Sequence, residues 1–148
     1  RYAEVLLLQA EAINERDGQP NQQAYDAFNK VRRRAFREDI NSNEAQPHDL
    51  EAGLDYESFR NAIIQERSWE LTLEQKHLFD LKRWKILVKT IKNSKIAKEY
   101  PEYNKQTIDF KHYRYPIPQA QREVNPNLWQ NYGYDGSTIT VNPYKGRE

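Results

Sequence analysis

The sequence predicts a mainly α-helical fold that ends in a long irregular tail. Apolar residues recur every three or four positions along much of residues 1–98, which is the period of a helix. Prolines then recur between residues 101 and 143, and no helix can run through them. We therefore expect one domain over residues 1–148, with a helical scaffold over residues 1–98 and an irregular tail over residues 99–148 that is rich in Pro, Asn and aromatic residues.

The first two expected helices form a hairpin. The first covers RYAEVLLLQAEAINERDG and stops at Gly18, and the second covers QQAYDAFNKVRRRAF after the turn QPNQQ. Alanines recur on both segments, so the two helices can approach closely. This arrangement over residues 2–36 is similar to one tetratricopeptide (TPR) repeat unit.

The remaining scaffold is predicted from the same periodicity. Residues 37–55 are polar and rich in turn-forming residues, and they predict a loop. A third helix begins near Tyr56 and runs through FRNAIIQERSWELTLEQ. A fourth helix, or a continuation of the third, covers LFDLKRWKILVKTIKN. The aromatic residues of the tail are expected to anchor it.

Composition narrows the function. The chain has 23 basic and 22 acidic residues, so its net charge of +1 gives no reason to expect nucleic acid as a partner. It has no cysteine, which excludes disulfides and thiolate metal sites. No apolar run approaches the ~20 residues of a membrane span, and no signal peptide or lipid-attachment cysteine is present. The chain opens inside a helical pattern without Met, so we expect a piece of a larger protein.

The stretch ERSWELTLEQKHLFDLKRW mixes charges with bulky apolar residues. Glu66 and Glu70 are one helical turn apart on a face shared with Phe59 and Ile63. Two neighbouring carboxylates cannot flank a glycosidic bond from opposite sides, as a glycosidase requires. Buried carboxylates need partners, so we predict paired, partly buried contacts that tie the third and fourth helices to the tail. The residues in this predicted network are Glu66, Arg67, Glu70, Asp80 and Arg83.

Other chemical motifs are incomplete. Glu74 and His77 form one E-x-x-H motif, but a di-metal bundle needs a second one. Acidic residues crowd residues 49–57 without the spacing of a calcium loop. No P-loop, glycine-rich dinucleotide turn or Ser/His/Asp set is found. We therefore expect no metal, no cofactor and no catalysis.

Two basic patterns have plain explanations. Arg32, Arg33, Arg34 and Arg37 lie at a helix end, where cations interact favourably with the helix dipole; nucleic-acid binding is the alternative. A row of lysines recurs over residues 85–98 and is typical of the solvated face of a helix. Attraction to an anionic membrane surface is the alternative for that row.

The tail holds the candidate ligand site. Its segment YRYPIPQAQREVNPNLWQNYGY places aromatic rings beside asparagine and glutamine amides. Rings stack on the C–H face of a sugar and amides bond its hydroxyls, so we predict ligand contacts from Trp129, Tyr132 and Tyr134. In the alternative, the rings pin the tail to the helices while the asparagines make turns.

Three stretches together carry a family resemblance. RYAEVLLLQAEAIN with AYDAFNKVRRRA, IIQERSWELTLEQKHLFDLKRW, and YPIPQAQREVNPNLWQNYGY resemble, in that order, the C-terminal half of SusD/RagB proteins, from Arg1 to Tyr134. The resemblance implies a mostly helical fold with TPR-like helix pairs. It also implies an outer-membrane lipoprotein at the cell surface, whose lipid anchor is absent from this chain. Such proteins cap a TonB-dependent transporter and capture oligosaccharides or other nutrients for import.

The sequence departs from the family pattern at two places, one of which is the end of the second helix, RRRAFRED, where the glycine often found is missing. The resemblance also leaves two functional possibilities. Either the chain contributes to glycan binding, or it is a TPR-like interaction scaffold that contacts the transporter while ligand binds elsewhere. The family usually has a small residue and then an arginine after the third-helix glutamate, as E-G-x-R, but here Glu74 is followed by Gln75, Lys76 and His77. Because His77 is a weaker cation than arginine, an ion pair implied by the family pattern is in question at this position.

Overall fold

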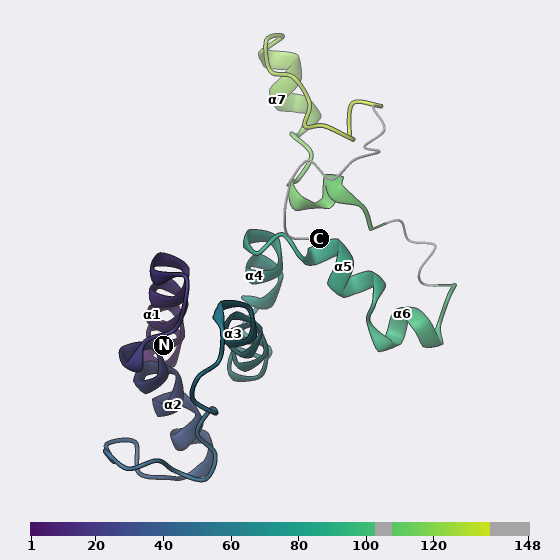
Figure 1. Ribbon diagram of the computed structural model, residues 1–148. Coiled ribbons are helices and arrows are strands. Elements are labelled where there is room, and N and C mark those ends of the chain that lie inside the picture. The colour runs from purple at the N-terminus through teal and green to yellow at the C-terminus, as the bar shows by residue number, and fades with distance from the viewer. Residues whose placement is uncertain (103–107, 137–148) are drawn as a thin grey trace. The chain divides into compact units, whose positions relative to one another are not determined.

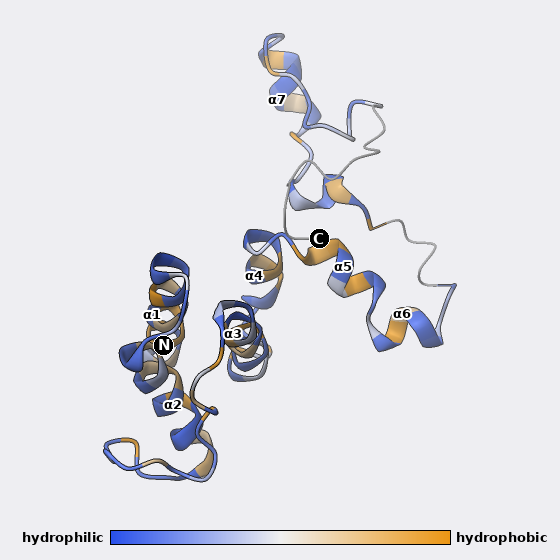
Figure 2. Cartoon of the chain, in the orientation of Figure 1, coloured by the Kyte–Doolittle hydropathy of each residue, from blue (hydrophilic) through white to orange (hydrophobic). Residues whose placement is uncertain are grey.

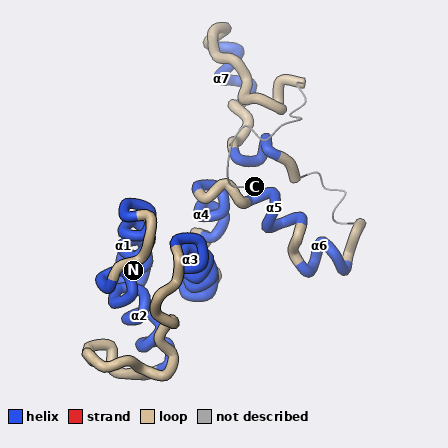
Figure 3. Tube along the Cα trace, in the orientation of Figure 1, coloured by secondary structure: helices blue, strands red, loops and turns tan. Residues whose placement is uncertain are grey.

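The computed structural model describes residues 1–102 and 108–136 (Figure 1). Within these ranges every regular element is a helix, and Figure 3 shows no strand there. The prediction of a mainly α-helical fold is therefore confirmed. The chain divides into two compact units, residues 1–77 and residues 78–148, which are described separately below.

The first unit begins with the predicted hairpin. Helix α1 spans Tyr2–Asp17 and ends at Gly18, whose φ of 68° is readily adopted by glycine and whose amide donates to the carbonyl of Asn14. Helix α2 spans Gln22–Phe36, and the side chain of Asn21 caps it by accepting from the amide of Ala24. The two helices pack side by side, as Figure 1 shows.

Helix α3, Tyr56–Glu70, completes the core of this unit and packs against α1. Phe59 of α3 is fully buried, with its ring centre 4.9 Å from that of Tyr25 and 5.8 Å from that of Phe28. Leu7 from α1 is also fully buried in this cluster. Burial of a side chain of this size stabilises a fold by about 1.5–3 kcal/mol.

Helix α3 ends earlier than the sequence predicts. The predicted helix extends to Gln75, but the helix stops at Glu70 and residues 71–75 form turns. Leu73 and Gln75 adopt φ angles of 66° and 59°. These left-handed conformations cannot continue a right-handed helix, so the chain bends here.

The described residues of the second unit contain four short α-helices and one 3-10 helix. Helix α4 spans His77–Arg83, α5 Leu87–Lys92 and α6 Lys95–Glu99; after residues 103–107 come the 3-10 helix η2, Phe110–Tyr113, and α7, Gln119–Val124. Leu81, Leu87, Val88 and Tyr113 form its buried cluster. Apolar segments of α5 stand out in Figure 2 among more hydrophilic neighbours.

The predicted fourth helix is divided into α4 and α5. Lys85 has a φ of 64°, and the amide of Ile86 donates back to the carbonyl of Leu81, which closes α4. The lysine row of residues 85–98 therefore lies on two short helices and their flanks instead of one helix, and its members from Lys89 onward are exposed, as expected of a solvated face. In the tail, α7 fits between Pro118 and Pro126, so the prolines bound a helix that none of them interrupts.

Candidate functional site

The predicted ligand residues lie in a segment of the second unit that is held together by one glutamine. The side chain of Gln130 accepts from the amide of Ile117 at 2.8 Å and donates to the carbonyl of Ile117 at 3.0 Å. Pro116 and Pro118 have no N–H, so Ile117 carries the one backbone donor of this tripeptide. Gln130 therefore satisfies both backbone groups of Ile117 and holds residues 116–118 beside residue 130.

One neighbouring amide strengthens this link and another forms a local turn. The Nδ2 of Asn131 donates to the carbonyl of Tyr115 at 2.7 Å, and the Oδ1 of Asn125 accepts from the amide of Asn127 at 3.1 Å. The side chains of Gln130, Asn131 and Asn125 thus bond to the chain itself. This is the turn-forming role that the sequence analysis gave as the alternative to sugar binding.

The predicted rings differ in exposure. Trp129 is 85% exposed and Tyr132 is 53% exposed. Tyr134 is half-buried, and its hydroxyl donates to the carbonyl of Arg114 at 3.3 Å. Trp129 and Tyr132 therefore expose more than half of their surface, while Tyr134 is placed to support the segment.

Lysines cover two tyrosines of this unit. The Nζ of Lys82 lies 3.9 Å from the centre of the Tyr115 ring, and that of Lys111 lies 5.7 Å from the Tyr134 ring. Burial raises the pKa of the Tyr134 hydroxyl, with smaller contributions from Asp109 and Tyr115. These contacts compete with a ligand for Tyr115 and Tyr134, and they leave Trp129 as the most available ring of the three predicted residues.

The predicted ionic residues of the first unit bond to helix α2. Glu66 accepts from the Nη1 of Arg32 at 3.0 Å, and both oxygens of Glu70 lie 2.6 Å from the Nη2 of Arg34. Burial raises the pKa of Glu66, Arg32 lowers it and Glu70 raises it, with a net upward shift. The carboxylates therefore join α3 to α2.

The sequence pattern does not predict Arg32 and Arg34 as these partners. It indicates only that the arginine cluster lies at a helix end, where cations interact favourably with the helix dipole. The sequence does hold a signal that could identify these partners. Carboxylates on the buried face of one helix require cations on the helix packed against it. The cluster RRR of α2 is a nearby supply of such cations in the sequence.

Glu4 of α1 joins two further cations. The guanidinium of Arg67, which is 3% exposed, lies 4.0 Å from Glu4, and Lys76 forms a close ion pair with the same carboxylate. The hydrogen bond from Lys76 is the main cause that lowers the pKa of Glu4. In the E-Q-K-H sequence that departs from the family pattern, Lys76 thus supplies a cation, while Glu74 pairs with Arg1.

In the second unit, Asp80 accepts from the Nε of Arg83 at 2.9 Å, one turn along α4. Asp80 is 5% exposed. The attachment of the predicted network to the tail stays a prediction.

Among the described residues, no three His, Cys, Asp or Glu side chains gather in a way that could hold a metal ion. No helix in the same ranges is long and apolar enough to cross a membrane.

Comparison with known proteins places these features in a family. The SusD family model matches residues 1–134. The SusD-like proteins P25 and P2 of Formosa agariphila are 37% and 33% identical to this chain, over 138 and 131 residues. These matches cover 90% and 88% of this chain and 24% of each relative.

A solved structure agrees with the sequence matches. The crystal structure of a SusD homologue from Bacteroides thetaiotaomicron superposes with a TM-score of 0.77 at 39% identity, over 88% of this chain and 26% of that chain. The chain spans about a quarter of the length of the relatives it matches. Since the family match extends over residues 1–134 and the fold agrees, the chain belongs to the SusD family.

Proposed function

We propose that this chain is part of a cell-surface protein that captures oligosaccharides for import through a TonB-dependent outer-membrane transporter. The observation that carries the proposal is the SusD family match over residues 1–134. Other nutrients remain possible cargo within the same proposal. A lipid anchor outside this chain would hold the protein at the outer membrane, where a SusC-like transporter would be its partner.

This chain's own contribution to binding would come from Trp129 and Tyr132. Both rings are more than half exposed, and the link between Gln130 and Ile117 fixes the backbone next to them. An aromatic ring held in place stacks on the apolar face of a sugar without further loss of backbone freedom. Tyr134 would support this surface through its bond to Arg114.

The proposed function is binding without catalysis. Glu66 and Glu70 are the carboxylate pair that could suggest hydrolysis, but each is bonded to an arginine of α2. They also lie one turn apart on a single helix, where they cannot face each other across a cleft. Their role in this proposal is to hold α3 against α2.

A second candidate function is a TPR-like scaffold that contacts the transporter while the ligand binds elsewhere. Helix α1 favours it, because Tyr2, Val5 and Leu8 are 72%, 57% and 41% exposed and recur every three residues along the helix. Exposed apolar residues at this spacing suit contact with another protein surface.

Affinity measurements on the complete protein that carries this chain would test the proposal. Titration calorimetry against a panel of neutral and acidic oligosaccharides should detect binding, and Trp129→Ala should weaken it about tenfold through the lost stacking surface. Trp69→Ala is the matched control, because Trp69 is also exposed, at 62%, but lies in α3. Failure of the wild-type protein to bind any oligosaccharide would refute the glycan proposal.

The same variants separate the two candidate functions. If Trp129→Ala and Tyr132→Ala both leave glycan affinity unchanged, the ligand contacts lie outside this part of the chain. If Val5→Lys then prevents co-purification with the transporter while glycan affinity is retained, the scaffold function is supported.

A further inference from the structure

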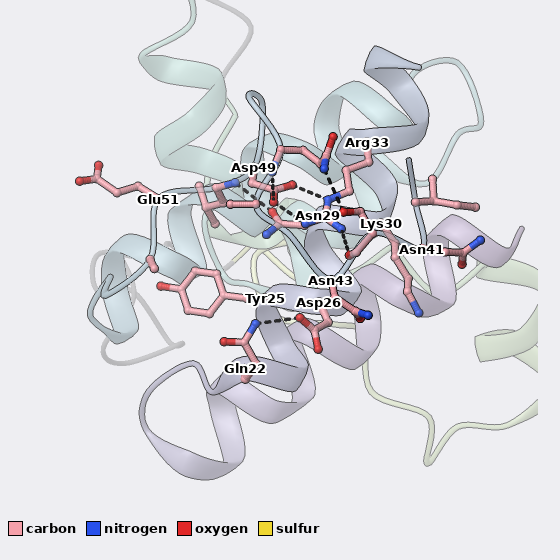
Figure 4. A pocket seen from close by; sticks show the side chains of 16 residues that line it. Gln22, Tyr25, Asp26, Asn29, Lys30, Arg33, Asn41, Asn43, Asp49 and Glu51 are labelled. Atoms are coloured by element: carbon pink, nitrogen blue, oxygen red, sulfur yellow. Dashed lines mark hydrogen bonds and ion pairs between the residues drawn. The ribbon is translucent and has the colours of Figure 1, made fainter. Parts of the chain in front are cut away.

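A polar groove lies between helix α2 and the loop of residues 37–55, which we name the α2 groove. Its volume is about 780 Å³, and Figure 4 shows the side chains that line it. Polar residues from both walls that matter here are Asp26, Asn29, Lys30, Asn41, Asn43 and Glu51. The sequence pattern predicts this loop wall only as a polar, turn-rich connection.

The loop wall of the groove is fixed by bonds to α2. Arg33 binds both carboxylate oxygens of Asp49, and its Nη1 donates to the carbonyl of Ser42 at 2.8 Å (Figure 4). Farther along the loop, the amide of Leu54 donates to the hydroxyl of Tyr25 at 2.9 Å. The groove is therefore formed before any ligand arrives, which lowers the entropic cost of binding.

Asn29 presents a free donor to this groove. It is 8% exposed, and its Oδ1 accepts from the amide of Leu50 at 2.9 Å. Its Nδ2 has no hydrogen-bond partner among the described residues, and this atom is accessible to solvent. Because Asn29 lines the groove, this oriented amide is available to an acceptor atom of a ligand there.

The charges of the groove select the class of ligand. Arg33 and Asp49 neutralise each other, which leaves Lys30 with Asp26 and Glu51. An anion would meet the two carboxylates and a cation would meet the ammonium group. The carboxylates do not gather closely enough with other ligands to hold a metal within the described residues. A neutral hydroxyl group suits such a mixture because it donates to a carboxylate and accepts from an amide or ammonium group.

We propose that the α2 groove binds the hydroxyl groups of a neutral saccharide, with Asn29 and Lys30 as donors and Asp26 as an acceptor. This inference rests on the proposed glycan-binding function and adds a contact site separate from Trp129 and Tyr132. The groove lacks an open aromatic face, since Tyr25 is 8% exposed and packs on Phe59. Recognition in the groove is therefore by directed hydrogen bonds, with no ring for stacking.

The test uses the complete protein carrying Trp129→Ala and Tyr132→Ala, titrated with neutral gluco-, manno-, galacto- and xylo-oligosaccharides. Asn29→Asp keeps an oxygen for the amide of Leu50 but replaces the free donor by an acceptor, and Lys30→Met removes an exposed ammonium group. Each should weaken the remaining affinity about tenfold. Lys92→Ala, an exposed lysine of α5, is the matched control and should change nothing.

The outcomes separate this inference from the proposed function. Wild-type protein that binds none of the saccharides refutes both. Wild-type binding that disappears entirely in the ring double variant, or that persists unchanged in Asn29→Asp and Lys30→Met, overturns the groove site alone. A melting temperature that stays within the range of the Lys92→Ala control establishes that the groove variants are folded.

Discussion

Arg33 and Asp49 form a two-pronged ion pair in which Nε lies 2.7 Å from Oδ1 and Nη2 lies 2.5 Å from Oδ2. The two side chains are 11% and 12% exposed. Arg33 also binds the carbonyl of Ser42, and Asp49 accepts from the amide of Gln46. One side chain of α2 thereby organises a loop that has no regular structure of its own.

Asp49→Asn is expected to loosen the loop of residues 37–55. The substitution leaves the largely buried guanidinium of Arg33 without its counter-charge, at a cost of about 3 kcal/mol in the free energy of unfolding. Denaturant unfolding measures this loss. Glu51→Gln, an exposed carboxylate in the same loop, is the control, and an equal effect of both substitutions would contradict the assigned role of Asp49.

The same pair predicts a pH dependence. The hydrogen bond from Arg33 is the main cause that lowers the pKa of Asp49 below its ordinary value of 3.8. The stabilisation is therefore complete above pH 3.8 and is lost as pH falls through the lower pKa of the folded state. Acid unfolding curves of the wild type and Asp49→Asn should converge below pH 3.8; a constant gap down to pH 2 would contradict this origin.

For Glu66, the predicted change of stability with pH has the opposite sign to that for Asp49. Burial raises the pKa of Glu66 above 4.5, so the charged carboxylate is disfavoured in the folded state. Its proton is held more tightly in the folded state, and stability falls as pH rises from 4.5 through the raised pKa. Glu66→Gln removes this cost while an amide oxygen can still accept from Arg32, so the variant should gain stability relative to the wild type over that pH window.

Glu66→Ala provides the contrasting variant. It leaves Arg32 without the partner 3.0 Å away, and it should be less stable than Glu66→Gln at pH 7. Urea unfolding at pH 4 and pH 7 tests both variants. A stability difference between Glu66→Gln and wild type that is the same at the two pH values would show that the Glu66 carboxylate does not titrate as assigned.

Helix beginnings could be predicted from the sequence because their signals are local. Asn21 and Asp55 each cap a helix by accepting a backbone amide three residues later, and Gly18 ends α1 in a conformation suited to glycine. Each signal depends on a few neighbouring residues, so a single sequence is enough to find it. The hairpin of residues 2–36 follows from these signals together with the apolar period.

Two helix ends could not be predicted for a physical reason. Leu73, Gln75 and Lys85 have positive φ angles, although none of them is a glycine or an asparagine. The backbone leaves the helical region at these positions, and the sequence gives no turn residue to mark them. The ion-pair partner of Glu66 could not be predicted either. Its pairing with Arg32 depends on how two helices pack, which periodicity alone does not define.

Gln75→Gly is expected to stabilise the first unit. Gln75 has a φ of 59°, a conformation that costs a residue with a side chain about 1–2 kcal/mol. Glycine adopts it freely but loses about 0.5–1 kcal/mol through its more flexible unfolded state, so the net gain should be about 0.5–1 kcal/mol. Gln65→Gly, the same change at an exposed position inside α3, should lose about 1 kcal/mol. Thermal unfolding that lowers stability in both variants would contradict the assigned backbone strain.

Gln130→Leu should release the segment that carries Trp129. Leucine has a similar size but cannot bond to the amide and carbonyl of Ile117, so two backbone groups lose their partner. Hydrogen exchange should become at least tenfold faster at the amides of Ile117 and Asn131, since both donate to Gln130. Gln121→Leu on exposed α7 is the control and should leave exchange at both amides unchanged.

If exchange stays slow in Gln130→Leu, other contacts hold residues 116–118. If it quickens while glycan affinity stays intact, binding does not depend on a preformed arrangement of the Trp129 segment.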